Sequence, residues 1–235
     1  MSSGAGTRWP SRPTMLRPAL IGGSLLVAII VGLGVGYGVH RLTSGTGTGT
    51  AAAPATVSTH FGMYGEAAWA EGTQPAPMID TLREQTGKLF SLASLRGRSV
   101  AIVFFDSHCR QECPLEGREL AAAEQSLPPS RRPVMVVVSV NPLDTPASAA
   151  SAAKAWGLAA VAPWHWLMGT RKQLAPVWAE YHVYVSPHPV NGDIAHTEAV
   201  YLVDRRGDMR SGYQYPFLSR FVTSDLRTIA KGRGA

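Results

Sequence analysis

The fold is decided by the stretch Val100-Ala101-Ile102-Val103-Phe104-Phe105 and by the block Cys109-Arg110-Gln111-Glu112-Cys113-Pro114 that follows it. The first run is unbroken and apolar, which is typical of a strand buried on both faces of a sheet. Pro114 is favoured in the first turn of a helix, so a helix is predicted over residues 115–127. The chain has only two cysteines, and both precede this helix. A dithiol at this place is reactive, and it can either exchange disulfides or bind a soft metal.

Strands and helices are predicted to alternate along the rest of the chain. Unbroken apolar runs predict buried strands, and alternating apolar residues predict shorter ones. Asp144-Thr145-Pro146 is an N-cap signal for an alanine-rich helix. The predicted strands span 78–82, 89–92, 134–140, 164–167 and 199–203, a hairpin turn spans 204–208, and the predicted helices span 146–156, 170–181 and 218–231. The alternation predicts an α/β domain in which a central sheet carries helices on both faces.

The N-terminal part of the chain contains a predicted membrane anchor at residues 18–39. No residue in this run is charged, and about 20 apolar residues are enough to span a bilayer as a helix. Three arginines precede the run and one follows it closely, which places residues 1–17 in the cytoplasm and the remainder across the membrane. A cleaved signal peptide is the alternative, but its apolar region is only about 7–15 residues long. The arginines are Arg8, Arg12, Arg17 and Arg41.

Residues 40–75 are predicted to form a flexible tether between the anchor and a globular head, residues 76–235. The Gly/Thr-rich part of this segment cannot bury enough apolar surface to fold. Residues 60–69 are compatible either with packing on the head or with remaining loose. A head of about 160 residues buries close to 70% of its extended-chain surface and needs no disulfide for stability. The cysteines are therefore free to take part in chemistry.

The spacing of Cys109 and Cys113 is compatible with both chemistries. Residues four apart on a helical turn share a face, with Cα atoms about 6 Å apart. That separation allows a disulfide, and it also allows both sulfurs to bind one metal ion. Cys113 is predicted to lie at a helix N-terminus, where the helix dipole favours the thiolate. A structural disulfide without further function is the remaining alternative in an extracytoplasmic protein.

His196 is the candidate for a third ligand among the seven histidines. It directly precedes the strand at 199–203, and the loop entering that strand can lie beside the dithiol. Two thiolates and one neutral imidazole form a soft set suited to Cu(I), and Cu(II) can complete its sphere with water or oxygen. Zinc would require a fourth ligand. The other histidines considered are His165 and His182, expected to be structural, His40 beside the membrane span, and His60 and His188 in segments without a predicted element.

The head resembles the Sco/SenC family, thioredoxin-fold copper proteins anchored beside cytochrome c oxidase. The resemblance covers about residues 77–230 and is carried by Cys-x-x-x-Cys-Pro at 109–114 together with the late His196. It implies a thioredoxin-like fold and a copper site made by Cys109, Cys113 and His196. It further implies delivery of copper to the binuclear centre in the copper-binding subunit of cytochrome c oxidase or to another extracytoplasmic copper protein. The supporting stretches are 80–98, 104–114, 138–146, 167–170, 181–185 and 196–207.

Three positions depart from the family pattern: Asn141 stands where the family often has an aspartate, Pro176 falls inside a predicted helix, and the third departure lies next to His196. Ala195 stands where Sco-like proteins usually have an acidic residue immediately before the late histidine. A metal-bound histidine commonly donates its second N–H to a carboxylate or a carbonyl group, which fixes the orientation of the ring. Asp193, Glu198 or a backbone carbonyl is therefore expected to orient His196.

Composition and motif spacing exclude several other classes of function. The net charge is +6, but no basic stripe is interleaved with aromatic residues, so no nucleic-acid surface is predicted. A peroxiredoxin would have threonine where Asp106 stands relative to Cys109. The sparing use of cysteine argues against a purely structural module with a dispensable dithiol.

The main alternative is a membrane-tethered thiol–disulfide oxidoreductase that reduces cysteines of extracytoplasmic partners. Thioredoxin-like oxidoreductases typically carry Cys-x-x-Cys and a cis-proline before the strand facing the dithiol. Here the motif is one residue longer, and no proline lies between Gly192 and Tyr201. We therefore expect a metallochaperone rather than an enzyme, held in a bacterial cell membrane with its N-terminus in the cytoplasm.

Overall fold

The structure is a computed structural model of the 235-residue chain, and it describes residues 59–161, 163–189 and 193–232. The predicted leader, the predicted anchor at 18–39 and the first part of the predicted tether lie outside these ranges. Among the described residues, no helix has both the length and the apolar character needed to cross a membrane.

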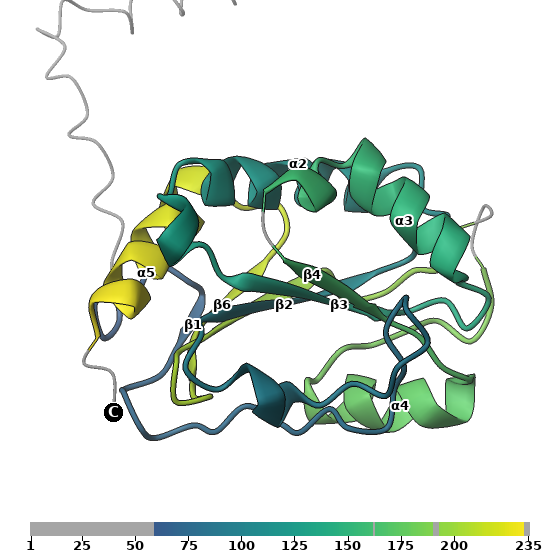
Figure 1. Cartoon of the computed structure of the whole chain (residues 1–235), viewed down its shortest axis with the longest axis horizontal. Helices are drawn as coiled ribbons and strands as arrows, with labels where there is room; N and C mark the ends of the chain where they lie inside the picture. Colours follow the sequence, from purple (N-terminus) through teal and green to yellow (C-terminus); the bar gives the residue numbers. More distant parts are fainter. Residues whose placement is uncertain (1–58, 162, 190–192, 233–235) are drawn as a thin grey trace, which may run out of the picture. The chain divides into compact units, whose positions relative to one another are not determined.

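A mixed sheet of six strands runs through the domain in the order β1-β6-β5-β2-β3-β4 (Figure 1). Strands β2, β3 and β4 are parallel to one another, whereas β5 is antiparallel to β2 and the sheet continues antiparallel through β6 to β1. The strands are β1 (Ala67–Ala68), β2 (Val100–Phe105), β3 (Val134–Ser139), β4 (Trp164–Leu167), β5 (Ala199–Val203) and β6 (Met209–Gln214).

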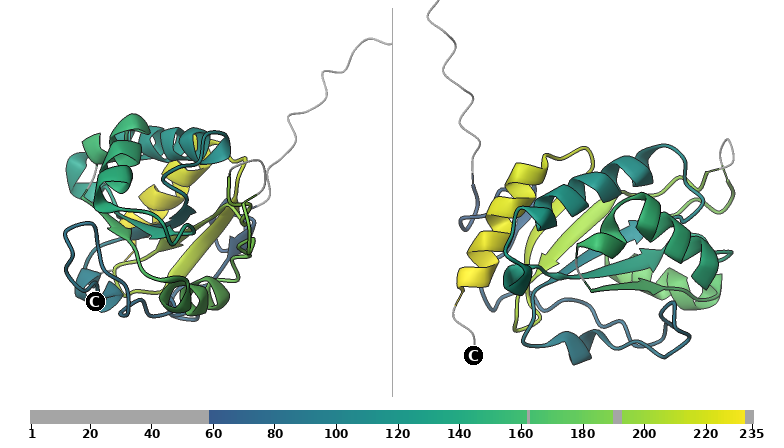
Figure 2. Two further views of the ribbon diagram at one scale, coloured as in Figure 1. Left: turned by 90° about the vertical axis from the view of Figure 1, so that its right-hand side faces the viewer. Right: turned by 45° about the horizontal axis from the view of Figure 1, so that its top comes forward.

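Helices cover both faces of the sheet, as Figures 1 and 2 show from three directions. Helices α2, α3 and α5 pack on one face, and α4 packs on the other. The helices are α2 (Glu112–Gln125), α3 (Pro146–Ala155), α4 (Arg171–Glu180) and α5 (Ser219–Lys231), and short 3₁₀ turns are η1 (Leu92–Leu95), η2 (Pro129–Arg131) and η3 (Leu158–Ala160). The predicted α/β class, a central mixed sheet flanked by helices, is confirmed.

Strand β2 is the centre of this arrangement, and all six of its residues are buried. Ala101, Val103 and Phe105 contribute to the core beneath α2, α3 and α5. Ile102 and Phe104 contribute to the core on the α4 side. Because successive side chains of a strand point to opposite faces, an unbroken apolar run is what a strand covered on both sides requires. The prediction for this stretch is confirmed.

The predicted strands at 78–82 and 89–92 are wrong. This part of the chain is irregular: an isolated bridge of Arg83 with Leu89 lies within it, and a second bridge, of Arg83 with Met168, joins it to the residue after β4. Its buried side chains complete the core on the α4 side of the sheet. The alternation of apolar residues therefore reflects a segment that lies across the sheet face with one side buried, and not a strand within the sheet.

The head begins earlier than the predicted boundary at residue 76. Residues 59–75, expected to end the flexible tether, pack on the domain: Met63 is fully buried, and β1 pairs with β6. The backbone N–H of Gly65 donates to the Asp225 carboxylate at 3.2 Å. A Cβ atom at Gly65 would lie 2.2 Å from Ser211 Oγ, so only glycine permits this close approach. A strand of two residues carries too little sequence pattern to be predicted.

Candidate metal-binding site

The dithiol and the late histidine meet at one edge of the sheet because of the strand directions. The chain leaves β2 at Phe105 and enters β5 at Ala199, and β2 and β5 are antiparallel, with Val103 opposite Val200. The end of β2 therefore lies beside the start of β5. His196, just before β5, reaches the dithiol side of this edge, as the sequence predicted for its loop.

The two cysteines lie at the junction between β2 and α2. Helix α2 begins at Glu112, three residues before the predicted start, so Cys113 lies inside its first turn, at the helix N-terminus as predicted. The backbone N–H of Cys113 points at Cys109 Sγ, 3.4 Å away. Both thiols are free; Cys109 is partly exposed, whereas Cys113 is buried. One sulfur is thus accessible and the other is protected.

The two thiols have opposite acidities. The pKa of Cys109 is lowered to about 7, first because its sulfur accepts a hydrogen bond from the Cys113 thiol, with further help from the backbone N–H groups of Gln111 and Cys113. The pKa of Cys113 is strongly raised, because its thiol is the donor of that bond and because it is buried. The lowered pKa was predicted for Cys113, and this prediction is wrong. The hydrogen bond to Cys109, together with burial, keeps the proton on Cys113 in spite of its place at the helix N-terminus.

Cys109 and His196 line one open cavity of about 390 Å³. Gln111 donates through Nε2 to Asp193 Oδ2 at 3.3 Å, which joins the dithiol loop to the histidine loop. The lining residues are Cys109, Gln111, Glu112, Asp193, Ile194, Ala195, His196 and Glu198. The structure thus brings together two of the three predicted ligands in one cavity, with Cys113 hydrogen-bonded behind them to Cys109.

Backbone carbonyl groups orient the His196 ring. Its Nδ1 lies 2.9 Å from the Ile194 oxygen, and its Nε2 lies 3.0 Å from the Phe104 oxygen. Of the groups considered from the sequence, the carbonyl is the partner, and neither Asp193 nor Glu198 is hydrogen-bonded to the ring. A neutral imidazole donates from one nitrogen only. Because both nitrogens face carbonyl oxygens, one of them would have to leave its carbonyl to bind a metal, while the other keeps its partner as in the usual arrangement of a metal-bound histidine.

The surroundings of the cavity are acidic. Glu112, Asp193 and Glu198 line it, and no lysine or arginine among the described residues does. Burial raises the pKa of Glu198 to about 7, with additional repulsion from Glu112 and the Cys109 thiolate. The nearby Glu116 is fully buried and its carboxyl oxygens have no hydrogen-bond partner. Its pKa is raised well above the ordinary value, mainly by burial. The negative charge of the carboxylates that line the cavity favours a cation bound there over a free thiolate.

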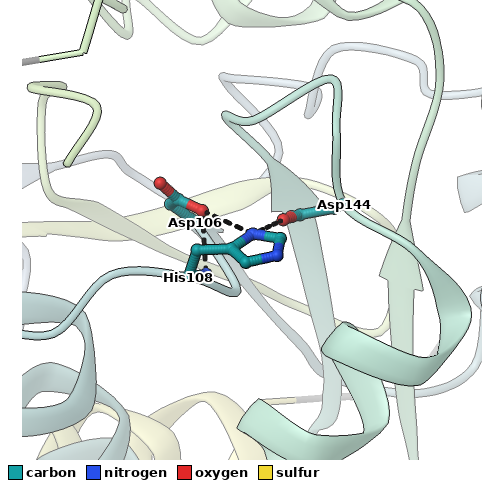
Figure 3. A group of neighbouring side chains, drawn as sticks. All are labelled: Asp106, His108 and Asp144. Atoms are coloured by element: carbon teal, nitrogen blue, oxygen red, sulfur yellow. Dashed lines mark hydrogen bonds and ion pairs between the residues drawn. The ribbon is translucent and has the colours of Figure 1, made fainter. Parts of the chain in front are cut away.

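A second group of polar side chains, missed from the sequence, fixes the dithiol loop from the other side (Figure 3). His108 Nδ1 lies 3.3 Å from Asp144 Oδ1 and 3.5 Å from Asp106 Oδ1. Of the N-cap signal Asp144-Thr145-Pro146, the cap of α3 is Thr145, whose side chain accepts from the Ser148 N–H. Asp144 is instead buried at the ends of β3 and β4.

The ligand atoms of this group, which lie within 4.8 Å of one another, are already used by hydrogen-bond donors. Asp144 accepts from Ser107, from the Ser139 hydroxyl and from the Trp166 indole. Asp106 Oδ1 accepts from the His108 N–H and the Asn141 amide. A cation would have to displace these donors, each of which is costly to leave unpaired. We therefore interpret the group as a support that fastens the Cys109 loop to the end of β3.

The other histidines considered from the sequence that the structure describes do not line the cavity. His165 is hydrogen-bonded to Glu84, and its ring lies 5.2 Å from that of Phe90, which agrees with the structural role expected for it. His60, His182 and His188 are exposed. His40 lies outside the described residues.

The fold and this site define a thioredoxin-like dithiol protein in which a late histidine shares a cavity with the first cysteine. The family pattern described as SCO1/SenC matches residues 80–231, so the chain belongs to the SCO1/SenC family. The resemblance found in the sequence is thereby confirmed. No curated protein matches the chain.

Solved structures of Sco proteins are similar over about two thirds of the chain. ScoI of Bradyrhizobium japonicum with copper bound is 26% identical, covering 66% of this chain and 99% of its own, with a TM-score of 0.53. ScoI of Arabidopsis thaliana with copper bound is 21% identical, covering 67% and 99%, with a TM-score of 0.58. BsSco, described as having a disulfide switch and as a member of the Sco family of cytochrome c oxidase assembly proteins, is 19% identical, covering 72% and 100%, with a TM-score of 0.58.

Proposed function

We propose that the protein is a copper metallochaperone in which Cys109, Cys113 and His196 hold one copper ion. The observation that carries this proposal is the cavity shared by Cys109 and His196, to which the antiparallel pairing of β2 and β5 contributes both loops. The similarity to Sco proteins solved with copper bound supports the choice of metal.

The donor set fits copper in its chemistry. Two thiolate sulfurs and one imidazole nitrogen are soft to intermediate ligands, which suit Cu(I), and an open cavity leaves room for the water or oxygen ligand that Cu(II) would add. A structural zinc ion prefers four ligands from the protein. Carboxylates line the same cavity, but hard oxygen ligands rank below thiolates for Cu(I).

Each ligand has a distinct role in loading. Cys109, whose pKa is about 7, presents a thiolate near neutral pH. Cys113 must lose its proton when the metal binds, since only the thiolate is a ligand. His196 binds through one nitrogen and donates from the other to a backbone carbonyl. Because protons compete with the metal at all three positions, affinity falls as the pH is lowered.

The proposed recipient is the copper-binding subunit of cytochrome c oxidase or another extracytoplasmic copper protein. BsSco is described as belonging to a family of oxidase assembly proteins, which supports this choice. The uncharged run at 18–39 would anchor the chain with its N-terminus in the cytoplasm. The tether that follows would hold the head near membrane-embedded recipients.

A second function, reduction of partner disulfides, is favoured by the unequal thiols. The accessible Cys109 thiolate attacks one sulfur of a partner disulfide, forming a mixed disulfide and releasing the other partner sulfur as a thiolate. Cys113 then gives its proton to the partner thiolate released in the first step and attacks Cys109, which forms the Cys109–Cys113 disulfide and releases the second partner thiolate. Two electrons pass from the dithiol to the partner. Since the oxidised pair cannot bind metal, the two functions exclude each other at any one moment.

The test is an anaerobic copper titration of the reduced full-length chain in detergent micelles, followed by mass spectrometry and absorption spectroscopy. We expect one tightly bound copper per chain, loss of binding in Cys113→Ser, and roughly 10- to 100-fold weaker binding in His196→Ala. His60→Ala removes another exposed histidine and should bind copper as the parent does.

Two results would change the proposed function. If His196→Ala holds copper as tightly as the parent, the three-ligand site is wrong. If no stoichiometric copper binds while Cys109 and Cys113 cycle readily between dithiol and disulfide, the protein is an oxidoreductase.

A further inference from the structure

Four arginines line a second cavity, of about 310 Å³, at the opposite edge of the sheet from the dithiol. Arg98 and Ser99 directly precede β2, the η2 turn directly precedes β3, and Arg205 follows β5. Because β2 and β3 are parallel and β5 is antiparallel to them, these three segments meet at the same edge. The polar side chains in the lining are Arg98, Ser99, Ser130, Arg131, Arg132 and Arg205.

Two of these arginines are fixed by backbone carbonyl groups. Arg132 donates to three of them. Its Nε donates to the carbonyl oxygens of Glu124 and Leu127, and its Nη1 donates to that of Val161 at 2.9 Å. Arg205 donates through Nε to the Gly97 carbonyl at 2.8 Å. These bonds hold the guanidinium groups in place without neutralising their charge. Two of the four cations are thus pre-organised at the cavity.

The charge of the cavity is not balanced by acidic side chains. Within the described part of the chain, none of the four arginines forms an ion pair with a carboxylate, and the hydroxyl groups of Ser99 and Ser130 have no hydrogen-bond partner. The acid that lies near Arg132 is Glu124, which is buried. Burial raises the pKa of Glu124 to about 8, against the opposing effect of Arg132. Glu124 is therefore neutral at pH 7.

We propose that this cavity binds a phosphate group, supplied by an anionic lipid headgroup or by a soluble phosphate. Guanidinium groups match the oxygens of phosphate with paired N–H donors, and the two serine hydroxyls add neutral donors. The volume is at the lower end of the range of small-ligand sites, which suits a headgroup rather than a larger cofactor. This inference does not depend on the copper site.

The position of the cavity leaves the dithiol accessible. The six-residue strand β2 separates the arginine edge from the Cys109 loop by about 20 Å, at ~3.3 Å per residue. Ala230, near the end of α5 at the left of Figure 1, also borders the arginine cavity. A phosphate at this edge would leave the acidic cavity and its cysteine open to a partner.

The test uses the full-length chain in neutral detergent micelles at constant ionic strength. In one arm, inorganic phosphate is titrated calorimetrically against a chloride blank. In the other, micelles doped with phosphatidylglycerol or with phosphatidylcholine are compared by the thermal unfolding midpoint. We expect saturable binding or a higher midpoint in at least one arm, with phosphatidylcholine inactive. Arg98→Gln and Arg131→Gln should each weaken the effect about 5- to 10-fold.

Arg118→Gln is the matched control, since it removes an exposed arginine on α2 away from the cavity. Binding that survives in Arg118→Gln and fails in the cavity variants supports the site, and the responding arm identifies the source of the phosphate. The proposal is overturned if inorganic phosphate shows no saturable binding and phosphatidylglycerol raises the unfolding midpoint no more than phosphatidylcholine does. It is equally overturned if all three variants lose binding alike, which would indicate a general effect of net charge.

Discussion

The Nε2 atom of His196 lies 3.0 Å from the carbonyl oxygen of Phe104, so the ring spans from the loop before β5 to strand β2 itself. Phe104 is at the buried centre of the sheet, and its carbonyl is therefore a fixed partner. A second carbonyl, that of Ile194, faces the other ring nitrogen. Backbone carbonyl groups thus orient the ring in this chain. An acidic side chain immediately before the histidine, where this chain has Ala195, would be the alternative partner.

The reactivity of Cys109 is expected to follow its lowered pKa. In metal-free, reduced protein, the rate of alkylation by iodoacetamide should rise with pH through a midpoint of about 7. Cys113→Ala removes the thiol that donates to Cys109 and should move the midpoint up towards about 8.5, the value of an unperturbed cysteine. In Cys109→Ser, the buried Cys113 should react slowly at pH 8. Equal midpoints in the parent and in Cys113→Ala would contradict the assignment of the hydrogen bond.

Removal of the Asp144 carboxylate is expected to destabilise the fold and loosen the dithiol loop. Asp144→Ala leaves the hydroxyl groups of Ser107 and Ser139 without their carboxylate acceptor, whereas the Trp166 indole keeps the Ser139 oxygen at 2.8 Å; the loss should lower the free energy of unfolding by about 2–4 kcal/mol. Urea unfolding followed by tryptophan fluorescence measures this loss. The exposed Asp80→Ala should change stability by less than about 0.5 kcal/mol; a loss as large as that of Asp144→Ala would argue against a specific role.

Glu124 is expected to make the fold less stable as the pH rises. Its pKa is raised from 4.5 to about 8 in the folded protein, chiefly by burial. Between these values the unfolded chain releases the proton and the folded chain retains it, so the free energy of unfolding falls with pH and levels off above about 8. By pH 7 the loss is about 3 kcal/mol, from the 2.5 pH units above 4.5 at ~1.4 kcal/mol per unit.

Glu124→Gln should abolish this part of the pH dependence, as measured by denaturant unfolding at pH 5, 6, 7 and 8. Glu180→Gln removes an exposed carboxylate on α4 and should leave the slope unchanged. A smaller slope should remain, because the pKa values of Glu116 and Glu198 are also raised; a slope in Glu124→Gln equal to that of the parent would contradict the prediction.

The main strands and the two cysteines could be predicted because their signals are local. A strand buried on both faces needs an unbroken apolar run, and β2, β3 and β5 have one. The irregular segment around Arg83 mimics a strand, because burial of one side alone produces alternation. Strand β1 has two residues, and its pairing is decided by β6 rather than by its own sequence.

The chemistry of the site depended on contacts between distant residues, and these have no local signal. His196 could be proposed from its place before a strand. A backbone carbonyl was one of three candidates for the group that orients it, and the sequence could not choose among them. The role of Asp144 could not be predicted, because it arises when the end of β3 is brought to the dithiol loop. The acidity of Cys109 was likewise hidden, since it depends on which of two neighbouring sulfurs is excluded from solvent.

The difference in exposure between Cys109 and Cys113 imposes an order on any exchange of sulfur ligands. An incoming thiol meets Cys109 at the mouth of the cavity, whereas Cys113 is shielded. A recipient would therefore displace the sulfur of Cys109 from a bound copper ion first and that of Cys113 last. A small thiol in solution that replaced Cys109 alone would leave the copper ion bound to Cys113. Only a protein that presents two ligands in succession could complete the transfer, which makes release a matter of recognition rather than of thiol concentration.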